Sequence, residues 1–313
     1  WRLNQVELLR LICSLRIGEL ELAGRNLDEV RRRPTADNPD CCPDYSFGSF
    51  PPMISIRCLR LCAVVSLTLI AVCRSGYAQP TPYERACARL ATGRRSDIVR
   101  LSELLRLNWE YSMREHPEAA TELGYTGLND RWTDNSLEAI ARREREFQAP
   151  LKVLKSINRA KLKPVDRLNY DLFLKQVEDA IEGSRFKGEY LAINQTGGVQ
   201  QNAAETLEIA PRRTVKDYED MIARLNALPQ VIEQTLVLLS HGLADGITQP
   251  RITLRDVPQQ VMDQMEPDPE KNPLLKPFQE FPAEIPEAER ARLRELSAMA
   301  LKDPAEKLAA LQQ

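Results

Sequence analysis

The chain has 313 residues, and its 43 lysines and arginines nearly balance its 45 aspartates and glutamates, giving a formal net charge of −2. The sequence has no basic stripe and no alternation of aromatic with basic residues, which argues against a nucleic-acid partner. The 235 residues that follow Ala78 are enough for one large domain or two small ones.

Residues 53–78 have the layout of a secretory signal peptide. Arg57 and Arg60 supply positive charge, and an uncharged apolar run follows over residues 61–73. This run is shorter than the roughly 20 residues that a membrane-spanning helix needs. Small residues then precede a cleavage site after Ala78. We therefore expect an exported protein, located in the periplasm or outside the cell.

Two other interpretations of residues 53–78 remain. The apolar run would be a buried helix in one of them and would end in a lipid anchor on Cys73 in the other. Val72 disfavours the anchor, because a small residue is expected before a lipidated cysteine. A folded domain in front of a signal peptide is inconsistent with export, so we interpret residues 1–52 as an upstream segment outside the native protein. The alternative is a genuine extension that ends in an internal membrane anchor.

Six of the seven cysteines lie before the proposed cleavage site, and only Cys87 follows it. One cysteine allows no intramolecular disulfide and no C-x-x-C pair for zinc, so the exported part must depend on its hydrophobic core. We predict that residues 79–96 are a linker and that Cys87 within them is an unpaired thiol rather than a nucleophile. Residues 97–313 are predicted to form an all-α, multi-helix region.

The first predicted helix spans apolar residues that recur with steps of three and four from Ile98 to Met113. A second helix begins at Pro117, which suits a first helical position, and ends at Gly124. The following twelve residues are rich in glycine, asparagine and aspartate, which predicts a loop.

The next helix is predicted to start at a cap formed by Asn135 or Ser136. Pro150 removes a backbone donor, so this helix should kink or break there. Another helix begins at Pro164 and stops at Gly183.

Residues 184–213 lack helical periodicity, and we expect an extended strand or loop with a turn at the paired glycines of TGGVQQN. Thr214 and Asp217 form a capping box, with aspartate in the place of the usual glutamate, at the start of a long helix. Pro229 should break or kink this helix, and Gly246 should end it.

A short helix capped by Asp256 is expected next. Residues 266–286 contain six prolines, which excludes a long helix and predicts an extended segment. The last helix begins near Glu287 and should break near Pro304.

Candidate catalytic groups are few. His116 stands before a proline at a helix junction, and His241 lies near a helix end, where a histidine meets the negative end of the helix dipole. Neither histidine has a second one three or four residues away, as a helical zinc pair requires, and no G-x-S-x-G motif is present. We therefore predict no catalytic, cofactor-binding or metal-ligating residue in this chain.

Five segments, in this order, carry a resemblance to a known family. They are LNWEYSMREHPEAATELGYTGLNDRWTDNS, DRLNYDLFLKQVED, YLAINQTGG, TVKDYEDMIARLNALPQVIEQTLVLLSHGLADGITQPRITL and NPLLKPFQEFPAEIPEAERARL. Together they make residues 97–313 similar to domain-of-unknown-function family 885, whose members are bacterial and often exported.

The resemblance implies a fold and an activity. Members of this family are similar to helical zinc-dependent metallopeptidases, and their zinc ligands lie in an HE-x-x-P-G-H stretch of the C-terminal half. Residues 97–313 would then be the N-terminal part of a zincin-like clamp of kinked antiparallel helices, with little or no strand. No family zinc ligand or catalytic residue falls on a position of this chain, so we expect the chain itself to be inactive.

Two interpretations of function follow. In the first, the full-length protein is a zinc-dependent, peptidase-like hydrolase. Its partners would be the C-terminal half of the same protein, against which part of the apolar face Leu225–Leu243 would pack, and a peptide substrate. In the second, the helices form a binding or scaffold module without catalysis. Membrane contact is expected only through the signal segment or a lipid anchor.

Overall fold

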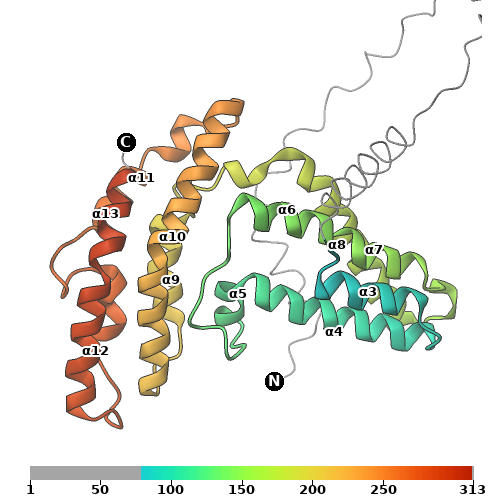
Figure 1. The fold of residues 1–313 in the computed structure, drawn as a ribbon, viewed down its shortest axis with the longest axis horizontal. Coiled ribbons are helices and arrows are strands. Elements are labelled where there is room, and N and C mark those ends of the chain that lie inside the picture. Colours follow the sequence, from blue (N-terminus) through green and yellow to red (C-terminus); the bar gives the residue numbers. More distant parts are fainter. Residues whose placement is uncertain (1–78, 312–313) are drawn as a thin grey trace, which may run out of the picture. The chain divides into compact units, whose positions relative to one another are not determined.

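The structure, a computed structural model, describes residues 79–311, and the part from Pro82 onward forms one compact unit. Figure 1 shows that this part is built from helices, which confirms the predicted all-α class. The only pairing of extended backbone among the described residues is an isolated bridge between Asn194 and Gly197. The proposed upstream segment and signal peptide, residues 1–52 and 53–78, lie outside the described residues.

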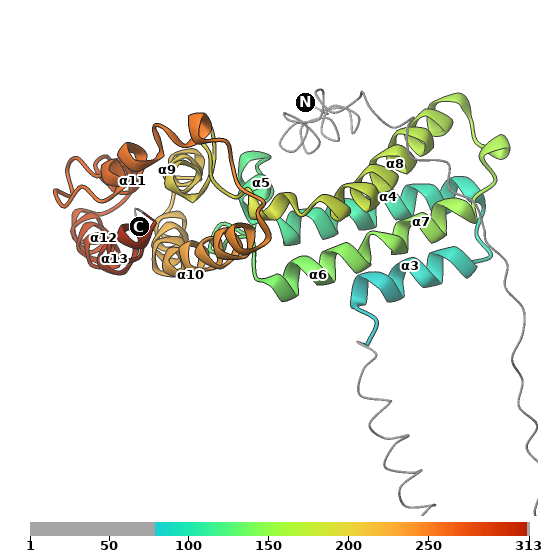
Figure 2. The ribbon, with the colours of Figure 1, turned by 90° about the horizontal axis from the view of Figure 1, so that it is seen from above.

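A first group of helices shares one hydrophobic core, and Figure 2 shows its members side by side. The core is centred on Leu104, Val153 and Phe173. The helices of this group are α3 (Pro82–Thr92), α4 (Asp97–Glu115), α7 (Gln148–Lys155) and α8 (Pro164–Gly183). Helix α6 (Leu137–Glu146) directly precedes α7 and contacts it.

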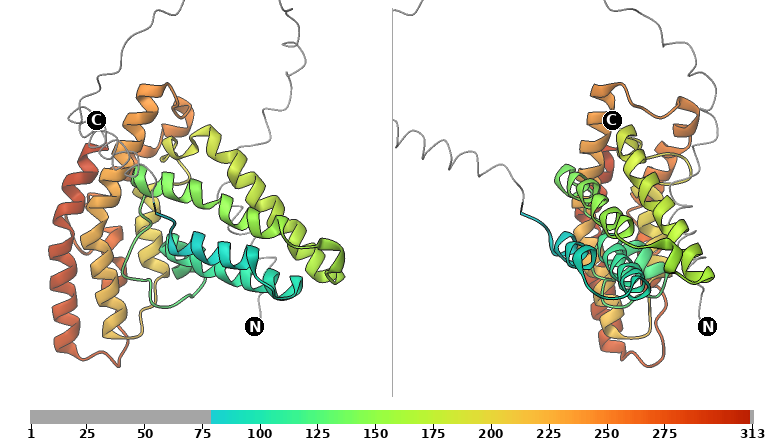
Figure 3. Two further views of the ribbon diagram at one scale, coloured as in Figure 1. Left: turned by 45° about the vertical axis from the view of Figure 1, so that its right-hand side comes forward. Right: turned by 90° about the vertical axis from the view of Figure 1, so that its right-hand side faces the viewer.

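A second group packs around the long helix α10, which contacts α9, α12 and α13 (Figure 3). Its core includes Tyr218, Leu225 and Leu293. The members are α9 (Val199–Ile209), α10 (Val215–Asp245), α11 (Val257–Gln264), α12 (Glu287–Ala300) and α13 (Lys302–Ala310). The short helix α5 (Pro117–Glu122) follows α4 and packs against α9.

Short 3-10 turns connect several of these helices. The proline-rich stretch predicted to be extended contains one of them, because a 3-10 turn accepts proline in its first positions. The 3-10 turns of the described residues lie at Arg159–Lys161, Ser184–Phe186, Gly188–Tyr190, Arg251–Leu254 and Pro273–Phe278, and the last of these is the one in the proline-rich stretch. None of the helices within residues 79–311 combines the length and the apolar character needed to cross a membrane.

The prediction of a linker over residues 79–96 is wrong. Residues 82–92 form α3, which packs against α4 and α7. Tyr83 and Cys87, one turn apart, are buried in the first core. The sequence pattern does not predict this helix, because most of its remaining residues are alanine or arginine and the repeat of large apolar residues is short.

Two helix breaks fall three residues before a proline. Phe147 separates α6 from α7, ahead of Pro150, and Leu301 separates α12 from α13, ahead of Pro304. Each proline therefore sits in the first turn of the new helix, where its missing N–H needs no partner. At Pro229, where a break or a kink was predicted, α10 has no break and continues to Asp245.

No helix was predicted within residues 184–213, and this prediction is wrong, because residues 199–209 form α9. Its buried positions include Gln200, Ala203, Thr206 and Leu207, which share one helical face. Two of these four residues are polar, so the apolar periodicity that signals a helix is hidden.

Three predicted capping signals are confirmed, and a fourth, at Asp256, is not. The Ser136 side chain accepts a hydrogen bond from the Ala139 N–H, which resolves the choice between the two predicted caps. The Thr214–Asp217 capping box has both of its hydrogen bonds, and Gly246 ends α10 in the left-handed conformation. Asp256 precedes α11 but makes no side-chain cap; it pairs instead with Arg255.

Candidate functional site

The two histidines lie on different elements, and neither belongs to a cluster of metal ligands among the described residues. His116 stands between α4 and α5, and its backbone N–H donates to the Ser112 carbonyl. His241 is exposed near the end of α10, with its ring stacked on Tyr190 at a centroid distance of 6.0 Å. Within residues 79–311 no three histidine, cysteine or acidic side chains gather as metal ligands. The described residues therefore do not fit a zinc ion.

Cys87 is a buried, free thiol in the first core. Burial raises its pKa to about 12. Because the thiolate is the reactive form, this cysteine has the character of a structural residue rather than a nucleophile.

A polar network joins α4 to α6. The Tyr111 hydroxyl donates to the Glu146 carboxylate over 2.6 Å, and Arg142 donates to both Glu146 and Glu115. Burial, followed by the hydrogen bond to Glu146, raises the pKa of Tyr111 and keeps it protonated. The buried Glu146 carboxylate is paired with a cation and a hydroxyl, so its charge is compensated. We call this network a structural bracket, because its hydrogen bonds hold α4 and α6 together.

A second bracket centres on Arg224 of α10, which is fully buried. Its guanidinium donates to the Arg131 carbonyl over 3.0 Å and to the Thr121 hydroxyl over 2.7 Å, and it lies over the ring of Trp132. Trp132 in turn donates to the Arg224 carbonyl over 2.8 Å. These contacts fix the loop after α5 to α10. The Nη1 atom of Arg224 is buried without a hydrogen-bond partner.

The segment predicted to be a strand or loop with a glycine turn is held by a buried amide. Gln200 donates through Nε2 to the carbonyls of Asn194 and Gly197, over 2.9 and 3.2 Å. Gly198 precedes α9 with a φ of 130°, a backbone conformation that residues other than glycine rarely adopt. The turn at the two glycines is confirmed, and it leads directly into α9.

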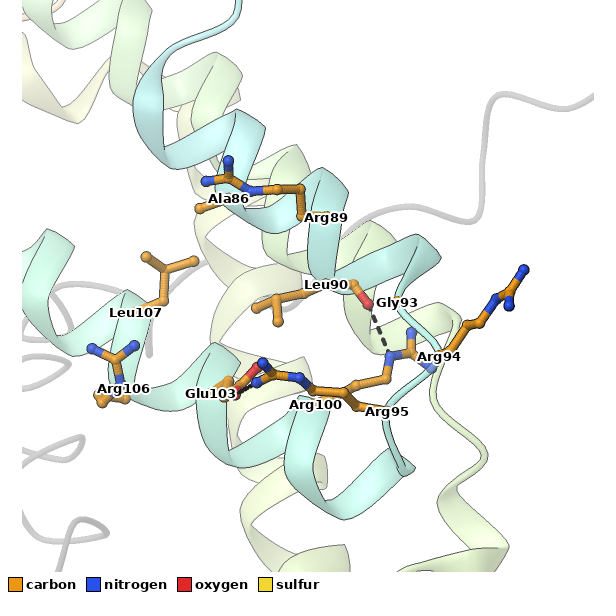
Figure 4. A pocket seen from close by; sticks show the side chains of 10 residues that line it. All are labelled: Ala86, Arg89, Leu90, Gly93, Arg94, Arg95, Arg100, Glu103, Arg106 and Leu107. Carbon is orange, nitrogen blue, oxygen red and sulfur yellow. Dashed lines mark hydrogen bonds and ion pairs between the residues drawn. The ribbon is translucent and has the colours of Figure 1, made fainter.

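An arginine-rich pocket lies between α3 and α4. It is open to solvent on one side and has a volume of about 400 Å³, within the range of about 300–1,000 Å³ typical of small-molecule sites. Figure 4 shows side chains from both helices and from the turn that joins them. The lining residues are Ala86, Arg89, Leu90, Gly93, Arg94, Arg95, Arg100, Glu103, Arg106 and Leu107.

One arginine of the pocket has a structural role. Arg100 is 6% exposed, and it donates to the Leu90 carbonyl over 2.8 Å and to the Ala91 carbonyl over 3.1 Å. It also pairs with Asp97 over 3.2 Å. The last carbonyls of a helix lack intrahelical partners, so Arg100 caps the C-terminus of α3 and fixes the turn beside the pocket.

The other arginines differ in their pairing. Arg95 forms an ion pair with Glu103, and Arg106 forms one with Glu110. Arg89 is exposed, and the structure gives it no hydrogen bond or ion pair with another described residue. The pocket thus has an excess of positive charge and no nucleophile or unpaired acid, so it is suited to binding rather than to bond cleavage.

Sequence reasoning missed this pocket because residues 79–96 were expected to be a linker. The signal that was available is the density of arginines at positions 85, 89, 94 and 95. Only the packing of α3 on α4 turns that density into a site.

Comparison with known families gives a match over the larger part of the chain. The model of a family described as bacterial protein of unknown function (DUF885) matches residues 117–313, from the first residue of α5 onward. The match covers more than half of the chain and does not include the arginine-rich pocket. No curated protein matches the chain.

Proposed function

Because the chain belongs to the bacterial family of unknown function DUF885, we propose that it is part of an exported, zinc-dependent, peptidase-like hydrolase. In this proposal the described residues supply a helical framework and not the reacting groups. The observation that supports it is the family match over α5 to α13, together with the resemblance of this family to helical zinc metallopeptidases.

The framework role rests on the contacts of the described residues. Arg224 connects the loop after α5 to the N-terminal third of α10, and the capping box at Thr214 fixes the start of that helix. Gln200 holds the turn before α9. Each of these groups stabilises an element without offering a free acid, base or nucleophile.

Zinc would be held by residues outside 79–311, since the described residues do not converge on a metal site. When bound, zinc supplies a Lewis acid that polarises a carbonyl group and lowers the pKa of bound water. We propose that the family's HE-x-x-P-G-H stretch lies in the coding sequence that follows Gln313.

The test begins with that coding sequence and continues with the complete gene product. We expect the product to hydrolyse a peptide library, to lose activity with a chelator and to regain it with zinc. The 313-residue chain is the matched control and should be inactive and retain no stoichiometric zinc after dialysis. Absence of the stretch, or hydrolysis by the 313-residue chain alone, would contradict the proposal.

A non-catalytic binding module is the second candidate. The arginine-rich pocket favours it, because this pocket can hold a ligand but contains no reacting group. A complete gene product that binds peptides without cleaving them, with or without zinc, would support this candidate over the hydrolase.

A further inference from the structure

The pocket between α3 and α4 combines two kinds of surface. Ala86 and Leu90 of α3 and Leu107 of α4 form apolar wall, while Arg89 and Arg106 line the same space with guanidinium groups. Figure 4 shows Leu90 and Leu107 between the two helices, with Arg94 directed away from the other side chains. A ligand that fills this pocket meets apolar and cationic surface together.

The positive charge of the pocket is only partly compensated. Its lining contains five arginines and one glutamate. Arg100 pairs with Asp97, Arg95 with Glu103 and Arg106 with Glu110, which leaves two of the five arginines, Arg89 and Arg94, without an acidic partner among the described residues.

The surroundings of Arg89 differ from those of several paired surface arginines in this structure. The pairs Arg106–Glu110, Arg185–Glu182 and Arg290–Glu287 join residues three or four positions apart along the chain. The residues at these spacings from Arg89 are Arg85, Ala86, Thr92 and Gly93. No acid therefore lies within one helical turn of Arg89.

We propose that this pocket binds a small amphiphilic anion, a carboxylate or phosphate group carried on a short apolar body. Guanidinium groups bind such anions through two parallel hydrogen bonds, and Arg89 is free to do so. Arg106 can join it, because exposed ion pairs such as Arg106–Glu110 contribute little and are readily exchanged. Leu90 and Leu107 then contact the apolar body.

Arg100 gives this site a fixed turn. Its hydrogen bonds to the Leu90 and Ala91 carbonyls hold the end of α3 against the start of α4. The backbone around the pocket is therefore set before a ligand arrives, which reduces the ordering cost of binding.

The test is calorimetric titration of the 313-residue chain with hexyl phosphate, inorganic phosphate and hexanol. We expect saturable binding of one hexyl phosphate, at least tenfold weaker binding of inorganic phosphate, and no binding of hexanol. Arg89→Gln combined with Arg106→Gln should weaken hexyl phosphate binding at least tenfold. The control Arg114→Gln, at an exposed arginine of α4 outside the pocket, should leave it unchanged.

A variant that is expected to bind more tightly is also needed, because a misfolded variant can lose affinity but cannot gain it. Glu103→Gln removes the acid of the pocket and releases Arg95, so it should strengthen hexyl phosphate binding several-fold. Equal weakening by Arg114→Gln, or no strengthening by Glu103→Gln, would overturn the proposal in favour of nonspecific attraction to a basic surface.

A second experiment, with lipid vesicles, distinguishes a lipid headgroup from a free anion as the ligand. Binding to vesicles of phosphatidylglycerol and phosphatidylcholine that is lost in the Arg89/Arg106 double variant assigns a lipid headgroup. Retained hexyl phosphate binding without vesicle binding assigns a free anion. Both results support the site and are independent of the proposed zinc-dependent hydrolysis.

Discussion

Replacement of Gly198 by alanine tests the structure of the turn before α9. Gly198 has φ 130° and ψ 171°, a region that is almost restricted to glycine. A Cβ atom added there would lie 2.3 Å from Gln200 Oε1 and 3.1 Å from the Ile193 Cα atom. Alanine would therefore strain the backbone and also displace the buried Gln200 amide.

The expected cost has two parts. The backbone conformation costs about 1–3 kcal/mol for a residue other than glycine. Displacing the Gln200 amide removes two hydrogen bonds, one to the Asn194 carbonyl and one to the Gly197 carbonyl, although each carbonyl keeps a backbone donor. At about 0.5–1.5 kcal/mol for each bond, this costs roughly another 1–3 kcal/mol. For a unit of this size, 1 kcal/mol lowers the melting temperature by about 2–4 °C. We expect a loss near 4 kcal/mol and a decrease of roughly 8–16 °C.

Thermal and urea unfolding of the 313-residue chain provide the measurement, with two glycine controls. Gly246 has φ 72° and open space around its Cβ position, so Gly246→Ala should show the backbone cost alone, about 1–2 kcal/mol. Gly183 has neither constraint, and Gly183→Ala should be neutral or stabilising by up to about 1 kcal/mol.

A double-mutant cycle separates the two parts of the cost. In a Gln200→Ala background the close contact with Oε1 is absent, so Gly198→Ala should cost only its backbone term. If Gly198→Ala is no more destabilising than Gly246→Ala, or if its cost is the same in both backgrounds, the contact between Gly198 and Gln200 does not constrain the turn.

Three further predictions concern other parts of the chain. Arg224→Met removes the donor from buried carbonyls but also removes a buried charge, so we expect a net loss of about 1–3 kcal/mol in urea unfolding; a stabilised variant would show that the charge outweighs its hydrogen bonds. Burial raises the pKa of Cys87 from 9.0 to about 12, so the unfolded chain loses the thiol proton first and the free energy of unfolding should fall as the pH rises above 9. Cys87→Ala should make this fall less steep. Rapid alkylation of native Cys87 at pH 7 would contradict its burial. When translation begins at Met53, N-terminal sequencing of periplasmic protein should start at Gln79; uncleaved protein in the cytoplasm would refute the signal-peptide interpretation.

The apolar face of α10 shows where sequence reasoning was only partly sufficient. The sequence predicts that Leu225–Leu243 would leave apolar surface for a partner to cover. In the structure Leu225 and Leu228 are buried within the second core, while Leu243 at the end of the helix is 75% exposed. The chain's own α9, α12 and α13 pack against α10, so the number of neighbours, which periodicity does not report, decides how much of the face remains free.

Features that depend on residues within one helical turn were determined by the sequence alone. The capping box at Thr214, the cap at Ser136 and the glycine end of α10 at Gly246 are of this kind, because their hydrogen bonds join residues three to five positions apart. The helical class follows from the same local signals repeated along the chain.

The arginine-rich pocket and the Arg224 bracket were decided only by the tertiary structure. Arg89 gains its place in a site from the packing of α3 on α4, and Arg224 binds the Arg131 carbonyl, 93 residues away in the chain. In a linear sequence an arginine reads as a solvated surface residue, because burial and pairing depend on which distant segments meet it. The same reason explains α3 and α9: short helices with few apolar residues are stabilised by the cores they join and not by their own periodicity.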